Sequence, residues 1–211
     1  KSTAGGGGIG MRVCSDQQEL NTAFDDVKKL AANNFSDSGV YLETYIEHAR
    51  HIEVQIFGDG KGNVLTLGER DCSLQRRNQK VVEEAPAPNL SSNMREQLHQ
   101  WARLLGESIS YRSAGTVEFL LDIKRDKAYF LEVNSRLQVE HGVTECITGI
   151  DLVEWMIRLA AGEPLQHDQS DIKMTGAAME VRIYAEDPAH DFRPCTGQLT
   201  AISFPENIRI D

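Results

Sequence analysis

Hydrophobic and polar positions along this chain follow two periods, one typical of helices and one typical of strands. Apolar residues recur at helical spacing in three segments, which we expect to form helices at 16–32, 92–109 and 151–162. Asp16 with Glu19, and Asp151 with Glu154, form capping patterns at two of the predicted starts. The predicted inner stripe of the second helix consists of Met94, Leu98, Trp101, Leu105 and Ile109.

Shorter runs rich in β-branched and aromatic residues predict strands. They cover 40–46, 51–57, 64–69, 115–123, 129–134 and 178–185, and the polar turn 124–127 joins two of them into a hairpin. The last run alternates cleanly, with Glu180, Arg182 and Tyr184 on a polar face that could line a site. The pattern therefore predicts a mixed α and β fold, and the chain carries no internal repeat.

Two carboxylates meet in the predicted hairpin. If its loop has an odd number of residues, Glu118 lies directly opposite Glu132, and Asn134 shares the face of Glu132. Facing carboxylates repel each other unless a cation lies between them, and Mg²⁺ prefers such oxygen ligands. An exposed acidic hairpin edge explains the same residues equally well, so both interpretations stay open on these residues alone.

Composition narrows the classes of protein to consider. With 40% hydrophobic and 26% charged residues, 211 residues can bury a sizeable core in one domain or two small ones. A net charge of -10 argues against nonspecific binding to nucleic acid or to anionic membranes. Four widely spaced cysteines suggest neither a zinc site nor a disulfide framework, and no run resembles a signal peptide or a membrane span. We expect a cytoplasmic location.

The two ends of the chain favour a piece of a longer polypeptide. The sequence begins at Lys1 instead of Met, and it stops at Asp211 within a strand-like run.

A glycine-rich loop opens the sequence between Lys1 and Met11. Consecutive glycines let backbone N–H groups converge on phosphate oxygens, although a flexible linker is the alternative. The loop lacks the ending of a P-loop and no helix follows it directly, so neither a Walker motif nor a dinucleotide fingerprint is present. Further on, Arg76, Arg77 and Lys80 form a basic stretch that by default is a solvated surface.

Taken together, seven segments in this order and spacing resemble the ATP-grasp part of biotin carboxylases. They are the glycine loop with Lys1, and residues 50–55, 69–73, 80–88, 114–118, 132–141 and 185–188. The resemblance implies an α+β ATP-grasp fold, in which a small lid subdomain closes over nucleotide lying on a larger domain with an antiparallel sheet flanked by helices. Residues 1–45 would be the lid, incomplete at its N-terminal end, and 46–195 the main domain with the metal and bicarbonate site. Residues 196–211 would begin the C-terminal biotin carboxylase region.

The resemblance also implies roles for single residues in nucleotide and metal binding. The ATP phosphates would be held by Lys1, Gly5, Gly6, Gly7, Gly8 and Gly10. Glu43 and Ile46 would border the adenine, while His51 and Gln75 reach toward the nucleotide. Mg²⁺ or Mn²⁺ would be bound by Glu118 and Glu132, with Asn134 nearby, which is the pair that the hairpin pattern also picks out.

The same resemblance implies the catalytic chemistry. Bicarbonate would be held by Arg136, Gln138 and Val139, a guanidinium and a backbone N–H being suited to a planar anion. Glu140 would be the general base that removes the proton of bicarbonate before it attacks ATP. Arg182 would stabilise the enolate charge of biotin, which another domain carries. Partners would be biotin carboxyl carrier and carboxyltransferase domains and, for the complete domain, a second copy in a homodimer.

Within the family, the sequences of four segments are similar to those of urea carboxylases, including the carboxylase half of urea amidolyases. These segments are 1–11, 75–80, 152–156 and 191–194. The resemblance therefore implies carboxylation of biotin on the way to urea. Acyl-CoA, pyruvate and guanidine carboxylases are the alternatives. Two further hypotheses are an ATP-grasp ligase that passes an acyl-phosphate to an amine without biotin, and a non-catalytic fragment or assembly module.

Overall fold

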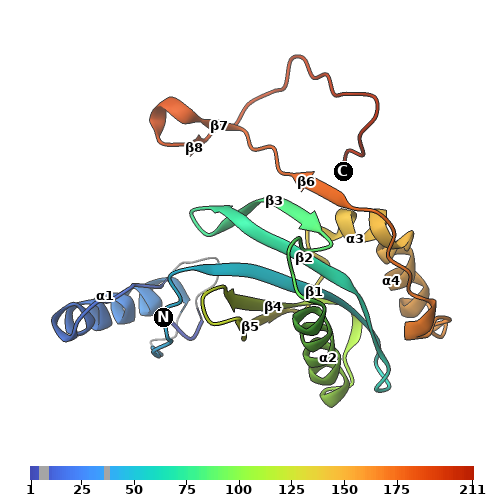
Figure 1. The fold of residues 1–211 in the computed structure, drawn as a ribbon. Helices are drawn as coiled ribbons and strands as arrows, with labels where there is room; N and C mark the ends of the chain where they lie inside the picture. Colours follow the sequence, from blue (N-terminus) through green and yellow to red (C-terminus); the bar gives the residue numbers. More distant parts are fainter. Residues whose placement is uncertain (5–9, 36–38) are drawn as a thin grey trace.

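The computed structural model describes residues 1–4, 10–35 and 39–211, and an antiparallel sheet forms its centre (Figure 1). Six strands follow one another in the order β5-β4-β1-β2-β3-β6. Their bounds are β1 (Ala49–Asp59), β2 (Val64–Arg76), β3 (Gln79–Ala85), β4 (Arg112–Asp122), β5 (Lys127–Asn134) and β6 (Ala178–Val181). A small ribbon of β7 (Glu186–Asp187) and β8 (Arg193–Pro194) lies apart from this sheet.

Three of the four described α-helices begin at a side-chain cap, whereas the helix that begins at His141 has none. They are α1 (Gln17–Phe35), α2 (Ser92–Ser108), α3 (His141–Thr148) and α4 (Leu152–Ala160), with short 3-10 turns η1 (Gln169–Asp171) and η2 (Pro188–His190). Oδ1 of Asp16 accepts from the Glu19 backbone N–H at 2.8 Å, and Oδ1 of Asp151 accepts from that of Glu154 at 2.8 Å. Both predicted caps are thus confirmed.

Two hydrophobic clusters lie on opposite faces of the sheet. Ile52, Val54 and Ile56 of β1 pack with α2, whereas Phe57, the next residue along the strand, packs with α4. A third cluster joins α3 to β3. Because side chains alternate along a strand, His51, Glu53 and Gln55 belong to the face of Phe57. The polar positions of β1 therefore lie on the side of the sheet that α3 and α4 cover.

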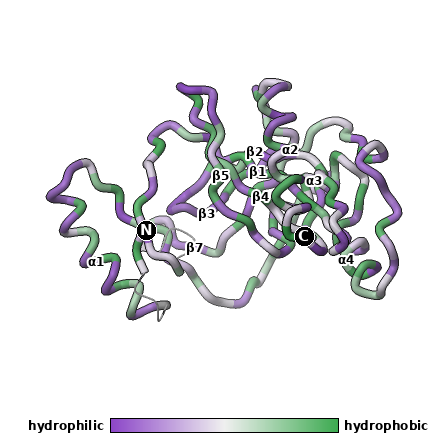
Figure 2. Tube along the Cα trace, turned by 90° about the horizontal axis from the view of Figure 1, so that it is seen from below, coloured by the Kyte–Doolittle hydropathy of each residue, from purple (hydrophilic) through white to green (hydrophobic). Residues whose placement is uncertain are grey.

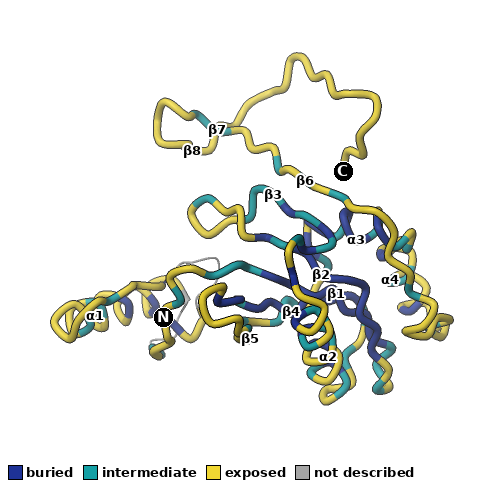
Figure 3. The backbone as a smooth tube through the Cα atoms, viewed as in Figure 1, coloured by how far each residue is buried: buried dark blue, intermediate teal, exposed yellow. Residues whose placement is uncertain are grey.

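Burial follows this layering (Figure 3). It is deepest in the central strands β1, β2 and β4, whereas the segment after β6 is exposed along most of its length. Hydrophobic stretches likewise concentrate in the strands, and α1 alternates between hydrophilic and hydrophobic positions (Figure 2). Helix α1 lies to one side of the sheet, near the N-terminus.

Two expectations from the sequence are wrong. Residues 40–46 form no strand beyond an isolated bridge between Ser2 and Val40, and Leu42 is 69% exposed, so strand propensity here finds no neighbouring strand to pair with. In α2 the buried stripe is Met94, Leu98, Ala102 and Gly106 instead of the stripe that includes Trp101 and Ile109. The reason is close packing at Gly106, where a Cβ would lie 3.0 Å from Cγ1 of Val64.

Two further differences concern the length of one strand and a helix that the sequence analysis did not predict. Strand β6 ends at Val181, earlier than the predicted 178–185, and the hydrophobic pattern did not indicate α3. Within the described ranges no helix is both long and apolar enough to span a bilayer.

Candidate active site

A row of charged residues crosses four strands of the sheet. Glu53 on β1 is the register partner of Arg70 on β2 and of Glu118 on β4, and Glu118 in turn is the partner of Glu132 on β5. Direct partners point to the same face, so three carboxylates and one guanidinium stand side by side. Adjacent like charges are unfavourable in a sheet. A cation must therefore be close to them.

The predicted pairing of Glu118 with Glu132 is confirmed, but for a different reason. The hairpin turn has four residues, 123–126, and an even turn alone would place Leu131 opposite Glu118. The ladder shifts by one residue between Glu118 and Phe119, so Leu131 is the extra residue of a β-bulge. This bulge brings Glu132 into line with Glu118.

Lys80 supplies a cation beside the row. Its Nζ donates to Glu118 Oε1 at 2.7 Å and to Glu140 Oε1 at 2.6 Å, and it also contacts Glu53. Burial by itself would lower the pKa of Lys80, yet the surrounding carboxylates, led by Glu53, raise the pKa above its usual value. Lys80 is therefore a fully charged, largely buried ammonium.

Arg70 fixes the other end of the row. Its guanidinium is fully buried and donates to Glu53 at 2.5 Å, to Gln55 at 2.7 Å and to Thr144 of α3 at 2.8 Å. A further bond of 3.3 Å reaches Thr116. All three nitrogens of the planar guanidinium donate, two of these bonds coming from Nη1, so Arg70 holds β1, β2, β4 and α3 together.

Glu118 lies in the middle of several donors. Its Oε1 also accepts from Asn134 Nδ2 at 3.0 Å and from Gln138 Nε2 at 3.2 Å, while His51 Nε2 lies 3.1 Å from Oε2. Burial would raise the pKa of Glu118, but His51 and Lys80 outweigh it and hold the pKa far below its usual range. Glu118 is ionised at any physiological pH.

Glu140 is a carboxylate held between two cations. Lys80 binds Oε1, and Arg182, the residue directly after β6, donates from Nη2 to Oε2 at 2.6 Å. Burial would raise the pKa of Glu140, but the charges of Lys80 and Arg70 lower it instead. The polar face of 178–185 thus lines the site, as its alternation suggested.

The remaining predicted site residues lie around this cluster or apart from it. Gln75 Nε2 lies 3.0 Å from Nδ1 of His51, and so orients that ring. Arg136 and Val139 are exposed, and the side chain of Arg136 donates to the carbonyl of Leu137, at 3.3 Å, and to no other described residue. Among the described residues Glu132 has no side-chain hydrogen bond or ion pair.

Three of the predicted nucleotide-binding residues, Lys1, Gly10 and Glu43, lie near one another. Lys1 Nζ is 3.5 Å from Glu43 Oε2, and the Ser2 N–H donates to the carbonyl of Gly10 at 2.9 Å. Ile46 is half-buried. Gly5, Gly6, Gly7 and Gly8 fall outside the described residues.

Sequence reasoning missed Lys80, Glu53 and Arg70 as members of the site. Lys80 was visible in a basic stretch that we interpreted as solvated surface. The signal that could have found Glu53 is the alternation of 51–57, where polar His51, Glu53 and Gln55 interleave with buried apolar residues.

The donor set beside Glu118 fits a hard divalent cation. Glu132 is an unpartnered carboxylate among the described residues, it faces Glu118 directly, and Asn134 follows it by two residues on the same face. Carboxylate and amide oxygens are ligands that Mg²⁺ accepts. His51, Glu53 and Glu118 also offer atoms within 4.8 Å of one another, but Lys80 already neutralises that group.

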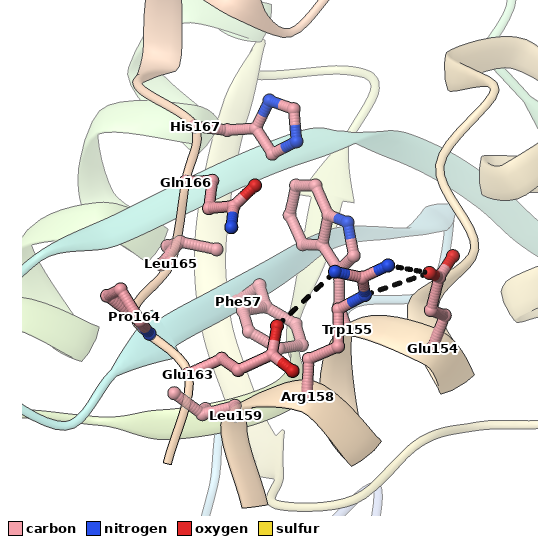
Figure 4. A pocket seen from close by; sticks show the side chains of 10 residues that line it. All are labelled: Phe57, Glu154, Trp155, Arg158, Leu159, Glu163, Pro164, Leu165, Gln166 and His167. Carbon is pink, nitrogen blue, oxygen red and sulfur yellow. Dashed lines mark hydrogen bonds and ion pairs between the residues drawn. The ribbon is translucent and has the colours of Figure 1, made fainter. Parts of the chain in front are cut away.

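A separate hollow lies beside α4 and the segment after it (Figure 4). Phe57 stands edge-on to Trp155 with centroids 5.3 Å apart, and Trp155 stacks on His167 at 4.9 Å. Arg158 on its rim is paired with Glu163 at 3.3 Å and with a second glutamate. None of the predicted site residues lines this hollow, so the candidate active site is the charged cluster.

The chain belongs to the family described as carbamoyl-phosphate synthase L chain, ATP binding domain, whose pattern matches residues 1–168. Among its relatives, the urea amidolyase of Lachancea kluyveri is 54% identical over the whole chain, which spans 12% of that protein. The propionyl-CoA carboxylase alpha chain of Ruegeria pomeroyi is 54% identical over 95% of the chain, which spans 29% of it.

Solved structures agree on the fold. The biotin carboxylase domain of Hydrogenobacter thermophilus 2-oxoglutarate carboxylase, determined with MgADP and bicarbonate, matches with a TM-score of 0.87 and 49% identity, over 92% of this chain and 43% of that one. The urea carboxylase of Kluyveromyces lactis matches with a TM-score of 0.74 and 56% identity, over 76% of this chain and 14% of that one. The α+β ATP-grasp fold is therefore confirmed, and the chain is similar to the ATP-binding segment of biotin carboxylases.

Proposed function

We propose that this chain is the ATP-grasp segment of a biotin carboxylase, which uses ATP and bicarbonate to carboxylate biotin through carboxyphosphate. The observation that carries the proposal is Glu140, a buried carboxylate held between Lys80 and Arg182 and next to the glutamate row. A base for bicarbonate, cations for developing negative charge and ligands for a metal stand together there. The similarity to a biotin carboxylase domain over 92% of the chain, and to a urea amidolyase over all of it, supports the same reaction.

In this proposal the N-terminal segment holds the nucleotide. Lys1 with the glycine loop, Gly5 to Gly8 and Gly10, binds the phosphates, and Glu43 and Ile46 border the adenine. The Lys1–Glu43 contact of 3.5 Å supports this, because it brings the phosphate-binding and adenine-binding parts together. Residues 1–45 would form the lid, 46–195 the main domain, and 196–211 the start of the C-terminal region.

Glu118 and Glu132, with Asn134, would hold Mg²⁺ or Mn²⁺. When bound, the ion supplies positive charge to the phosphate oxygens of ATP. The contribution of the protein is the bulge at Leu131, which aligns the two carboxylates, and His51 with Gln75, which support Glu118 from the other side.

Bicarbonate would lie between Arg136, Gln138, the Val139 N–H and Glu140. Glu140 takes the bicarbonate proton, and a bicarbonate oxygen then attacks the γ-phosphorus as ADP leaves. Carboxyphosphate breaks down to CO₂ and phosphate, and the phosphate takes the N1 proton of biotin. Arg182 would stabilise the enolate charge that remains on biotin.

We further propose that the carboxyl group passes to urea on another part of the polypeptide. The 54% identity to a urea amidolyase over the full chain supports this acceptor, and the 54% identity to a propionyl-CoA carboxylase keeps an acyl-CoA as the alternative. Biotin carrier and carboxyltransferase domains would be the partners, with a homodimer of the complete domain. Four free cysteines support a reducing, cytoplasmic location.

The test is ADP release by the full-length protein with Mg²⁺ and bicarbonate, with urea present or absent. ADP release that requires bicarbonate and increases when urea is added would support both the biotin carboxylase reaction and urea as the acceptor. If propionyl-CoA stimulates ADP release and urea does not, the reaction stands and the acceptor is an acyl-CoA. Release independent of bicarbonate would refute the biotin carboxylase reaction.

A further inference from the structure

Glu83 on β3 is a buried carboxylate for which the reaction above has no use. Its side chain is 0% exposed, and Oε1 accepts from Nε of Arg182 at 2.7 Å. Oε2 is buried and has no hydrogen-bond partner among the described residues. A buried carboxylate that is only half satisfied is unfavourable for folding, so its presence calls for a functional reason.

Arg182 connects Glu83 to Glu140. One edge of the guanidinium binds Glu83 through Nε, and Nη2 binds Oε2 of Glu140 at 2.6 Å. The sheet fixes this arrangement, because Glu83 and Glu180 are register partners on β3 and β6, and Arg182 lies two residues beyond Glu180. Both carboxylates therefore share a single cation, held between them by the backbone.

Because Arg182 binds both carboxylates, Glu83 affects how well Glu140 can act as a base. Lys80 and Arg182 both favour the ionised form of Glu140, and a carboxylate stabilised in this way takes up a proton poorly. A second negative charge on Arg182 offsets part of this effect. It draws the guanidinium toward itself, and it repels the negative charge on Glu140.

We infer that Glu83 is a positioning residue that holds Arg182 and, through it, keeps Glu140 basic enough to deprotonate bicarbonate. This inference rests on the proposed function. Glu83 touches neither substrate nor metal in this account, and it acts only through Arg182.

The charges around Glu83 place its own ionisation near neutrality. Burial raises the pKa of Glu83 to about 7; Arg182 opposes the rise, whereas Glu180 on β6 and Glu140 at the start of α3 add to it. Below this pH Glu83 is neutral, and Arg182 then acts on Glu140 without competition. The rate of bicarbonate deprotonation should accordingly fall as the pH drops through 7.

The experiment measures bicarbonate-dependent ADP release by the full-length protein from pH 6 to pH 9, at a fixed concentration of the bicarbonate ion. Glu83→Gln keeps the shape of the side chain and removes its charge, so it mimics the neutral form. We expect kcat to fall about tenfold at pH 8.5 with KM for ATP unchanged, and the two enzymes to converge below pH 7. Glu84→Gln is the matched control, because Glu84 is the next residue on β3 and has no side-chain hydrogen bond or ion pair among the described residues.

If kcat of the wild type and kcat of Glu83→Gln change with pH in parallel over the whole range, the inference is overturned and the proposed function stays intact. Absence of bicarbonate-dependent release in the wild type would overturn both. A second comparison does not depend on recovery of the Glu83 variant. In Arg182→Gln the wild-type inflection near pH 7 should disappear, and its persistence would mean that Glu83 does not act through Arg182.

Discussion

Glu53 on β1 and Glu118 on β4 are direct cross-strand partners, although both carry a buried carboxylate. Lys80, which donates to both of them, stabilises the pairing together with Arg70, which donates to Glu53. Lys80 thus lies between Glu118, a proposed metal ligand, and Glu140, the proposed base.

Replacing Lys80 by methionine removes the charge and keeps most of the volume. Because it leaves buried carboxylates uncompensated, we expect the free energy of unfolding of this domain to fall by about 3 kcal/mol. Thermal unfolding of the full-length protein with and without Mg²⁺ checks this. Mg²⁺ should restore more stability to the variant than it adds to the wild type, since a divalent cation replaces the missing charge. Equal stabilisation of both proteins would contradict the explanation.

Glu132 provides a test of the metal site. Glu132→Gln removes the charge of a proposed ligand without disturbing a hydrogen bond of the described residues, so the Mg²⁺ concentration for half-maximal ADP release should rise about tenfold. The control is Asp126→Asn, which removes an exposed carboxylate from the turn of the same hairpin. If both variants need the same Mg²⁺ concentration as the wild type, Glu132 is not a ligand.

The buried Glu83 predicts a change of stability with pH. Its pKa is raised in the folded protein, to about 7, so the folded state binds more protons than the unfolded state between the usual carboxyl pKa and 7. The contribution of protonated Glu83 to the free energy of unfolding is fully present below the usual carboxyl pKa, and it is lost as the pH rises through 7. We expect Glu83→Gln to melt at a higher temperature than the wild type at pH 8 and at the same temperature at pH 5. A difference of the same size at both pH values would contradict the burial argument.

Arg70 should be irreplaceable by lysine. Four bonds from one planar guanidinium cannot be made by a point charge, so Arg70→Lys leaves several of Gln55, Thr116 and Thr144 unsatisfied in the core. We expect a loss of about 3 kcal/mol in the free energy of unfolding. The exposed Arg103 of α2, whose ion pair with Glu107 spans 3.9 Å, should tolerate the same change within about 0.5 kcal/mol.

The sequence identified the hairpin and its facing carboxylates because strand alternation is a local property. It did not identify the bulge at Leu131, since the shift in register depends on how β4 and β5 pack as a pair. Lys80 was missed for a similar reason. A lysine in a basic stretch looks solvated until the fold brings three carboxylates from distant segments around it.

The error at 40–46 has the opposite origin. Its residues favour a strand, but a strand also requires a partner along most of its length, and there the described structure supplies only the bridge of Val40 to Ser2. For α2, the predicted helical period is confirmed, but the predicted buried face is wrong in part. The helix packs against Val64 through the buried Gly106, so its C-terminal half buries a different face from the one that Trp101 and Ile109 define.

The most direct test of the central claim follows oxygen from bicarbonate. The full-length protein turns over ATP with Mg²⁺, biotin and ¹⁸O-labelled bicarbonate, and the released phosphate is analysed by mass spectrometry. If carboxyphosphate forms, the bicarbonate oxygen that attacks the γ-phosphorus stays with the phosphate when the C–O bond breaks, so each phosphate carries one labelled oxygen. Phosphate without the label would mean that water, and not bicarbonate, attacks ATP, and would contradict the account.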